Sequence, residues 1–415
     1  MHKTNTPTIE NKSTYVASPY KGIRIAIYLF AFLLLCFPYL KPFGVGTTSD
    51  VQPAPLAISL LIFITHTLQN KKINERVSEY LLFILTLMLL FLGIYGFDAY
   101  YFFRGLYGYI SIIIITCATT VITKKVGIHL IETSLKFVFS VWTVIGIVQM
   151  FDPEIATFWR DKLIITAGRG SISLATEPAY FCLVILLISL SLIVISPKNK
   201  FYLFLSLLIS AIVAKSSVGV IYSAIAIALF SSKRPLHLAI YAGIAIATII
   251  FSLLIFQDSR IGSVLISFLS NPLKLAAVDQ SFGLRLTNVL IPIKAFINDY
   301  SVPHGFYQWT YYQYEYLNKY FPEYLWINLV DRPQDLGSGR VLSIHGQLIF
   351  ELGLIAPIFY ILLWRLIRPH SEHLRIYAIF MIMFLNGLTL NNPFLSILIS
   401  LCISTQKKLK QGNNL

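Results

Sequence analysis

The residues with the clearest chemical potential in this chain are charged side chains that border apolar segments. Residues 168–181 read GRGSISLATEPAYF, which places Arg169 and Glu177 just before an apolar segment that begins near Pro178. A guanidinium at the edge of a membrane suits bidentate binding of phosphate or pyrophosphate, although an ordinary phospholipid head group offers the same chemistry. Glu177 can act as a general base or, because it precedes a helix-starting proline, can interact with the dipole of the helix that follows.

A second set of polar residues lies in the last third of the chain. Arg285 lies in GLRLTNV, Arg340 in GSGRVLS and His345 in LSIHGQLIFELGLIAP, with Glu351 one and a half turns further on. An ionisable residue inside a membrane span is a functional candidate by default, but His345 is close enough to the boundary to be a solvated residue instead. His304, in VPHGFYQW, is interpreted as a loop residue hydrogen-bonded to the backbone.

The chain carries no motif of the common soluble enzymes. It has no Walker loop, no G-x-S-x-G, no H-E-x-x-H and no paired acidic metal motif. We therefore predict neither a metal site nor a cofactor, and any anionic substrate must be held by arginines. The four cysteines lie inside apolar segments, where they are interpreted as small hydrophobic residues rather than disulfides or ligands.

The elements that position these residues are apolar helices. Of 415 residues, 56% are hydrophobic and only 13% are charged, whereas a soluble domain needs roughly 25% charged residues to cover its surface. The apolar residues form segments of about 15–22 residues, which is the length of a membrane-spanning helix rather than of a barrel strand. The sequence predicts an all-α polytopic membrane protein with about 12 transmembrane helices.

The predicted spans are 23–40, 55–69, 78–96, 106–123, 133–151, 178–196, 201–215, 218–231, 236–256, 343–364, 374–388 and 391–405. The first is interpreted as a helix rather than a cleaved signal peptide. Near residue 216, two short spans and one long bent segment remain alternatives.

The net charge of +14 follows the predicted topology and does not indicate nucleic acid binding. With the N-terminus in the cytoplasm, most basic residues fall in cytoplasmic loops and in the C-terminal tail, while the short loops on the other side carry isolated ones. The cytoplasmic set is Lys71, Lys72, Arg76, Lys124, Lys125, Lys198, Lys200, Lys233, Arg234, Arg365, Arg368, Arg375, Lys407, Lys408 and Lys410. The isolated residues are Lys41, Arg104 and Lys215.

This topology divides the chain into three parts. Residues 1–256 form a bundle of nine spans, residues 257–342 form an extracytoplasmic loop domain, and residues 343–415 contain the last three spans and a cytoplasmic tail. Within the loop, SFGLRLTNVLIPIKAFIND predicts an amphipathic helix interrupted at Pro292. The aromatic cluster from Tyr311 to Trp326 fits either an interfacial belt or a stacking surface for sugar rings.

These features resemble the Wzy-type O-antigen polymerases, which share a superfamily with the WaaL-type O-antigen ligases. The resemblance rests on an arginine and serines followed by Glu-Pro before a middle helix, a long late loop with an arginine, and a His…Glu-Leu-Gly-Leu helix after it. Span count, loop placement and the location of both termini in the cytoplasm extend it over most of the chain. It implies a fold like the GT-C glycosyltransferases, in the bacterial inner membrane.

The resemblance also implies an activity and its residues. Such a protein is a metal-independent glycosyltransferase that polymerises oligosaccharide repeat units linked to undecaprenyl pyrophosphate, at the periplasmic face of the membrane. Its partners are the lipid-linked donor and acceptor glycans, membrane lipid and a chain-length regulator protein. By similarity, Arg169 and Arg285 bind pyrophosphate and His345 is the catalytic histidine. Arg340 is a further candidate for binding pyrophosphate, and Glu177 is a second catalytic candidate because it could accept the proton of the acceptor hydroxyl.

The chain departs from the family patterns in two places. In the ligases an asparagine follows the histidine, and a glycine comes about ten residues after it; here Gly346 follows His345, and Gly353 comes eight positions on. The spaced Arg-x10-Gly motifs of some polymerases are absent. A ligase or another lipid-linked glycan transferase therefore remains an alternative. A polysaccharide flippase or transporter is a further one, although we find no internal repeat and few charges within the spans.

Overall fold

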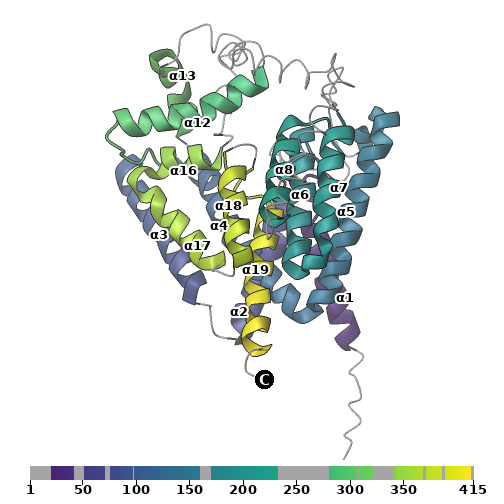
Figure 1. Cartoon of the computed structure of the whole chain (residues 1–415). Helices are drawn as coiled ribbons and strands as arrows, with labels where there is room; N and C mark the ends of the chain where they lie inside the picture. The colour runs from purple at the N-terminus through teal and green to yellow at the C-terminus, as the bar shows by residue number, and fades with distance from the viewer. Residues whose placement is uncertain are drawn as a thin grey trace, which may run out of the picture.

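The computed structural model describes residues 20–41, 51–70, 75–96, 98–158, 170–231, 280–306, 308–320, 341, 343–367, 371–385 and 388–412. Within these ranges the chain forms helices joined by turns and loops, and no strand occurs (Figure 1). The predicted all-helical class is therefore confirmed for the part of the chain that is described.

Five of the described helical segments are long and apolar enough to cross a membrane. They are α3 (Glu75–Tyr95), Phe102–Val126 within α4 (Ala99–Val126), α5 (Ile128–Phe151), α6 (Pro178–Ile195) and Ile344–Ile367. The last combines α16 (Ile344–Leu352), a 3₁₀ turn (Gly353–Ile355) and α17 (Ala356–Ile367).

Shorter apolar helices occupy the other predicted spans within the described ranges. They are α1 (Tyr20–Leu35), α2 (Ala54–Asn70), α7 (Phe201–Leu208), α8 (Ser217–Ser231), α18 (Ser371–Met383) and α19 (Pro393–Gly412). The predicted span 236–256 lies outside the described residues. The count of twelve spans and the likeness to GT-C enzymes remain predictions.

The buried helix α6 packs against α5, α8 and α19, and α19 in turn packs against α4. Nearly every side chain of α6 is buried, as expected for a helix that is apolar on all sides. Small polar residues lie where α4 meets α19: the Thr120 and Ser400 hydroxyls are 3.1 Å apart, and Ser396 Oγ donates to Ile112 O at 3.2 Å. Such residues allow close approach of helices and hydrogen bonds between them within a membrane.

The boundary near residue 216 is a sharp turn between two helices. The α7 helix continues into a π-helical turn (Ile209–Val213), and α8 packs back against α7. Lys215 has a φ of 46°, which lies in the left-handed region that a non-glycine residue seldom adopts. Two short helices that fold back on each other, not one bent segment, occupy this region.

Two helices lie across the upper end of the bundle as Figure 1 is drawn: α12 (Gln280–Asn298) and α13 (Trp309–Tyr320). The predicted amphipathic helix is α12, but it continues through Pro292 without the predicted interruption. It shares a small core with α13 and α16. The members of this core are Ile291, Ala295, Trp309, Tyr316, Val341 and Phe350.

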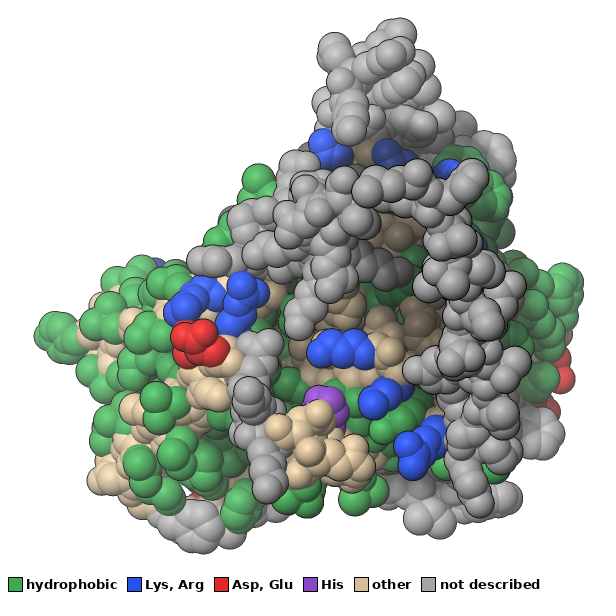
Figure 2. Space-filling view, turned by 90° about the horizontal axis from the view of Figure 1, so that it is seen from below, with side chains coloured by type: hydrophobic (Ala, Val, Ile, Leu, Met, Phe, Trp, Pro, Cys, Tyr) green, Lys and Arg blue, Asp and Glu red, His purple; other side chains and the backbone are tan. Residues whose placement is uncertain are grey.

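The opposite, lower end holds the start of α1 and the end of α19 (Figure 1). Seen from below, this face displays several Lys and Arg side chains (Figure 2). Lys124 and Lys125 are in the last turn of α4, and Lys198 and Lys200 lie in the 3₁₀ turn Pro197–Lys200 between α6 and α7. These basic turns therefore lie at the same end of the bundle as the start of α1 and the end of α19.

Candidate functional site

The structure describes some of the predicted site residues and not others. Arg169 and Arg340 lie outside the described residues. Arg285 lies on α12, where only its backbone position is described. Glu177 and His345 are both described, and they belong to different regions: Glu177 precedes α6, whereas His345 is in the first turn of α16.

The segment 170–177 is a loop held in place by one buried amide side chain, Gln149 near the end of α5. Gln149 Oε1 accepts hydrogen bonds from the backbone N–H of Ser173 at 2.7 Å and of Ile172 at 3.2 Å. Its Nε2 donates to Ser173 O at 2.8 Å. Ser173 Oγ also donates to Trp142 O at 2.6 Å. Gln149 thus satisfies backbone groups that would otherwise be buried without partners.

The other side of this loop contacts the turn between α7 and α8. Ser171 N donates to Val213 O at 3.0 Å, and a Cβ at Gly170 would collide with the backbone of Ala214. Only a glycine permits this close approach. Arg169 directly precedes Gly170 in the sequence.

A cavity of about 140 Å³ lies where the loop, the end of α5 and the turn after α7 meet. It is lined by Gln149, Met150, Pro153, Gly170, Ser171, Ile172, Val213 and Lys215. A lysine beside a polar loop is a setting that attracts an anion, because ammonium and backbone N–H groups both donate to phosphate oxygens.

Two of these residues were missed or undervalued in the sequence. Lys215 was assigned to a loop as an isolated basic residue, and Gln149 was not singled out. The signal for Gln149 was present, because the stretch IGIVQMF places one amide inside an otherwise apolar span. A polar side chain in a span needs a partner, and the partner of Gln149 is the loop backbone.

Glu177 is the N-cap residue of α6, and Pro178 occupies the first helical position as predicted. The backbone of Glu177 is extended, with φ of −145°, and its side chain makes no capping hydrogen bond. Its carbonyl accepts from Phe181 N at 3.1 Å, and the residue is exposed. Because the carboxylate is exposed, it can act either as a general base or as a partner of the helix dipole. Both roles therefore stay predictions.

Both ring nitrogens of His345 have hydrogen-bond partners. Nε2 is 2.6 Å from Met381 O on α18, and Nδ1 is 2.5 Å from the Tyr360 hydroxyl on α17. Because a carbonyl only accepts, Nε2 carries the hydrogen and Nδ1 accepts from Tyr360. A general-base role would require the Tyr360 hydroxyl to move away from Nδ1, so the catalytic assignment stays a prediction.

Glu351 is a buried carboxylate on the same helix, with 2% of its surface exposed. Its Oε2 accepts from the Tyr109 hydroxyl of α4 at 2.7 Å and from Gln347 Nε2 at 3.1 Å. Buried charge is costly unless it is hydrogen-bonded, and these two donors come from α4 and α16. The carboxylate therefore links the centre of the bundle to the helix that carries His345.

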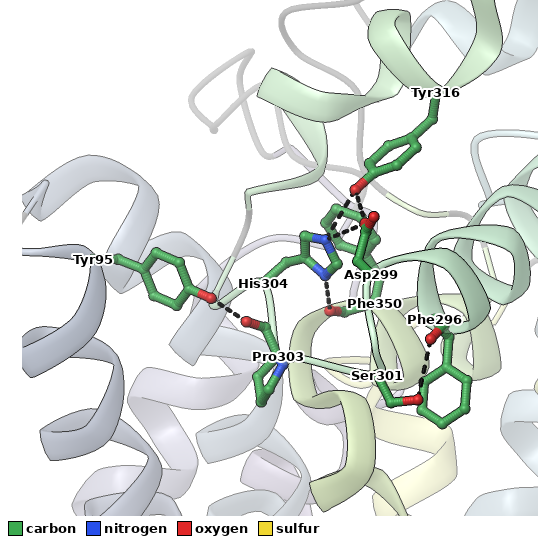
Figure 3. A network of polar contacts seen from close by, with 8 residues as sticks. All are labelled: Tyr95, Phe296, Asp299, Ser301, Pro303, His304, Tyr316 and Phe350. Atoms are coloured by element: carbon green, nitrogen blue, oxygen red, sulfur yellow. Dashed lines mark hydrogen bonds and ion pairs between the residues drawn. The ribbon is translucent and has the colours of Figure 1, made fainter. Parts of the chain in front are cut away.

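His304 lies in a network at the upper end of the bundle (Figure 3). Its backbone N–H donates to Phe350 O at 3.1 Å, and its Nδ1 is 3.2 Å from the same oxygen. This confirms the predicted backbone bonding. The sequence did not reveal that Nε2 lies 3.1 Å from Asp299 Oδ2 and 3.0 Å from the Tyr316 hydroxyl, which also donates to Asp299.

Two members of the aromatic cluster, Tyr312 and Tyr316, pack toward α16. Both contact the rings of His304 and Phe350, and the ring of His304 stacks on Phe350 with centroids 4.2 Å apart. These two tyrosines therefore pack against the small core. The side chains of the other aromatic residues in the cluster lie outside the described residues.

Comparisons with protein-family models, with curated proteins and with solved structures found no match for this chain. The resemblance to O-antigen polymerases therefore rests on the residues and the topology described above. Within the described residues, the sequence and the structure establish helices, five segments of which are long and apolar enough to cross a membrane, and a cavity lined in part by Lys215.

Proposed function

We propose that this chain is a membrane-embedded glycosyltransferase that polymerises oligosaccharide repeat units carried on undecaprenyl pyrophosphate, on the extracytoplasmic side of the bacterial inner membrane. One observation carries the proposal. Residues 170–172, which directly follow Arg169 in the sequence, fold against membrane helices and line a cavity that also contains Lys215. The segment singled out for anion binding thus adjoins a cavity with a cationic side chain.

The size of the cavity suits a phosphate group rather than a whole sugar repeat. A volume of about 140 Å³ is below the roughly 300–1,000 Å³ of pockets that enclose whole small-molecule ligands. The pyrophosphate would enter this space, while the prenyl chain stays in lipid and the glycan extends from the upper end of the bundle.

The reaction needs stabilisation of charge on the leaving group. As the bond between the donor sugar and the pyrophosphate breaks, negative charge grows on the departing oxygen, and cations already in position lower the barrier. Lys215 and Arg169 supply this charge in the proposal, with Arg285 and Arg340 as further candidates. Because pyrophosphate is a good leaving group, orientation contributes more than base strength.

The acceptor hydroxyl also has to lose a proton. Glu177 is the better candidate of the two, because it is exposed and lies five residues after Ile172, the last residue of its segment that lines the cavity. His345 would first have to lose the hydrogen bond between Nδ1 and Tyr360. Removing a general base lowers activity by about 10²–10⁴-fold, so Glu177→Gln should fall in that range.

The proposal is tested with purified lipid-linked repeat units and protein reconstituted in liposomes. We expect Arg169→Ala and Lys215→Ala each to lower polymer formation on the order of 10²-fold, because each removes one donor to the developing charge. Arg169→Lys should stay impaired, since an ammonium lacks the planar bidentate geometry. Lys198→Ala is the matched control, because Lys198 is an exposed lysine at the lower end, and it should polymerise normally.

Full-length polymer from both alanine variants would reject the cavity as the pyrophosphate site. Transfer of glycan to a lipid A core acceptor without polymer would favour a ligase, and movement of the lipid-linked glycan across the bilayer without bond formation would favour a flippase. Activity that is lost to a chelator and restored by a divalent cation would reject the metal-independent mechanism. Each variant is compared only after it elutes as a single species in detergent.

A further inference from the structure

The turn that follows α12 exposes large apolar side chains at the upper end of the bundle. Ile297 is 66% exposed, Tyr300 90% and Val302 53%. Single exposed apolar residues are common on any protein. These three residues are close in sequence and lie beside the membrane helices, where exposed apolar side chains can contact lipid.

The turn is bonded to the 3₁₀ turn (Gly353–Ile355) that directly precedes α17. Leu354 N donates to Ser301 O at 3.1 Å, and a Cβ at Gly353 would collide with the same oxygen. Leu354 is itself 67% exposed, and Ile358 and Ile361 are exposed behind it. Spacings of four and three residues place Leu354, Ile358 and Ile361 on one face of the helix.

A second exposed stripe reaches the turn from the other side. Leu82, Leu85 and Leu89 lie on one exposed face of α3, with Ile94 exposed near its upper end. The next residue, Tyr95, donates from its hydroxyl to Pro303 O (Figure 3). The exposed apolar faces of two membrane helices, α3 and α17, therefore converge on the turn.

The His304 network keeps this turn in place. Asp299 at the end of α12 and Tyr316 on α13 both bond to the ring of His304, whose backbone N–H donates to Phe350 O on α16. Gly305 N donates to Glu351 O at 3.2 Å. The turn is thus bonded to α3, α13 and α16. These bonds hold its outward side chains at a fixed position along the direction of the membrane helices.

We propose that the end of α12 and the following turn form a lipid-contact surface made of Ile297, Tyr300 and Val302, seated at the head-group boundary of the outer leaflet. In Figure 1, α12 lies across the upper end of the bundle and not parallel to the membrane helices. An interfacial helix has this orientation. Tyrosine favours this boundary. Lys294, exposed one turn before Ile297, can extend its amine to the phosphate layer. The inference does not depend on the glycan reaction.

Spin labelling of the full chain tests the lipid-contact surface. Ile297→Cys and Tyr300→Cys are labelled in a background lacking the four native cysteines and reconstituted in vesicles of phosphatidylethanolamine and phosphatidylglycerol. Oxygen concentrates in the bilayer, whereas a neutral nickel chelate stays in water. We expect both labels to be relaxed more strongly by oxygen than by nickel, as for Leu89→Cys on the exposed face of α3. Glu315→Cys, at an exposed position on α13, should show the reverse.

Stronger relaxation by nickel at both positions would place the turn in water and overturn the proposal. Weak relaxation by both reagents would mean that a second protein surface covers the turn, which also overturns it. Because the substituted side chains are exposed, folding should be preserved, and elution as a single species together with an unchanged melting temperature verifies this for each labelled variant.

Discussion

At the scale of single residues, Gln149 has the largest effect on the candidate site. One buried amide makes three hydrogen bonds to the backbone of residues 172 and 173, which lie 23 and 24 positions further along the chain. Together with the bond from Ser171 N to Val213 O, these bonds hold a loop of irregular backbone against the helices. Irregular backbone at the depth of a membrane is tolerated only when protein or water satisfies its polar groups.

Gln149→Leu keeps the size of the side chain and removes every one of these hydrogen bonds. We expect a loss of unfolding free energy of roughly 2–4 kcal/mol, because buried backbone groups are left without partners. Thermal unfolding in detergent measures this loss. Met150→Ala is the control, because Met150 is the exposed neighbour of Gln149, and it should unfold close to wild type. A melting temperature for Gln149→Leu that equals that of Met150→Ala would show that the loop does not depend on the amide.

At the scale of elements, the contact between α12 and α16 depends on a proline and a glycine. Pro292 has no N–H and cannot donate the helical hydrogen bond to the Asn288 carbonyl. That carbonyl lies against Gly346 of α16, where a Cβ would collide with it, and Pro292 Cγ would be 3.2 Å from the same Cβ. The proline that was expected to interrupt the helix therefore sits at its closest contact with a neighbour, and Gly346 is explained by packing.

Gly346→Ala should separate α12 from α16. The added methyl meets backbone, which cannot move aside as a flexible side chain would, so we expect a loss of about 1–3 kcal/mol. Gly93→Ala on α3 is a matched control, because a Cβ at Gly93 has no atom within 4 Å. It should leave stability unchanged or raise it by up to about 1 kcal/mol, since alanine is the better helix former. Equal melting temperatures for the two variants would contradict the close packing described here.

At the scale of the whole molecule, the helices alternate in direction, and the two ends of the bundle differ in charge. The start of α1, the end of α19 and the basic turns after α4 and α6 lie at the lower end, while α12, α13 and the start of α6 lie at the upper end (Figure 1). Positive residues favour the cytoplasmic side of a bacterial membrane. The upper end should therefore face outward.

Cysteine labelling with a membrane-impermeant maleimide checks this orientation. In intact spheroplasts Glu315→Cys on α13 should react, whereas Lys198→Cys between α6 and α7 should react only after the membrane is permeabilised. Both positions are exposed, so access across the membrane and not burial decides the result. Labelling of Lys198→Cys alone in intact spheroplasts would invert the topology and place the cavity on the cytoplasmic side.

The candidate site could be predicted only in outline. The sequence pointed to residues 168–181 because polar residues and Glu-Pro stand before an apolar segment, and that segment does line a cavity. It did not indicate Lys215, because a single lysine between two apolar segments looks the same whether it faces bulk water or a cavity. The positions of Arg169 and Arg340 and the side chain of Arg285 lie outside the described residues, so their joint role remains a prediction.

Within the described residues, the sequence by itself determined where the apolar helices lie and at which end their flanking charges lie. A helix in lipid satisfies its own backbone hydrogen bonds, so apolar length and flanking charge suffice to place it. Tertiary structure decided the partners of the polar side chains. Tyr109 and Glu351 are 242 residues apart, and Ser173 and Gln149 are 24. Such pairs form only when helices pack in one arrangement, and that arrangement leaves no periodic trace in the sequence of either partner.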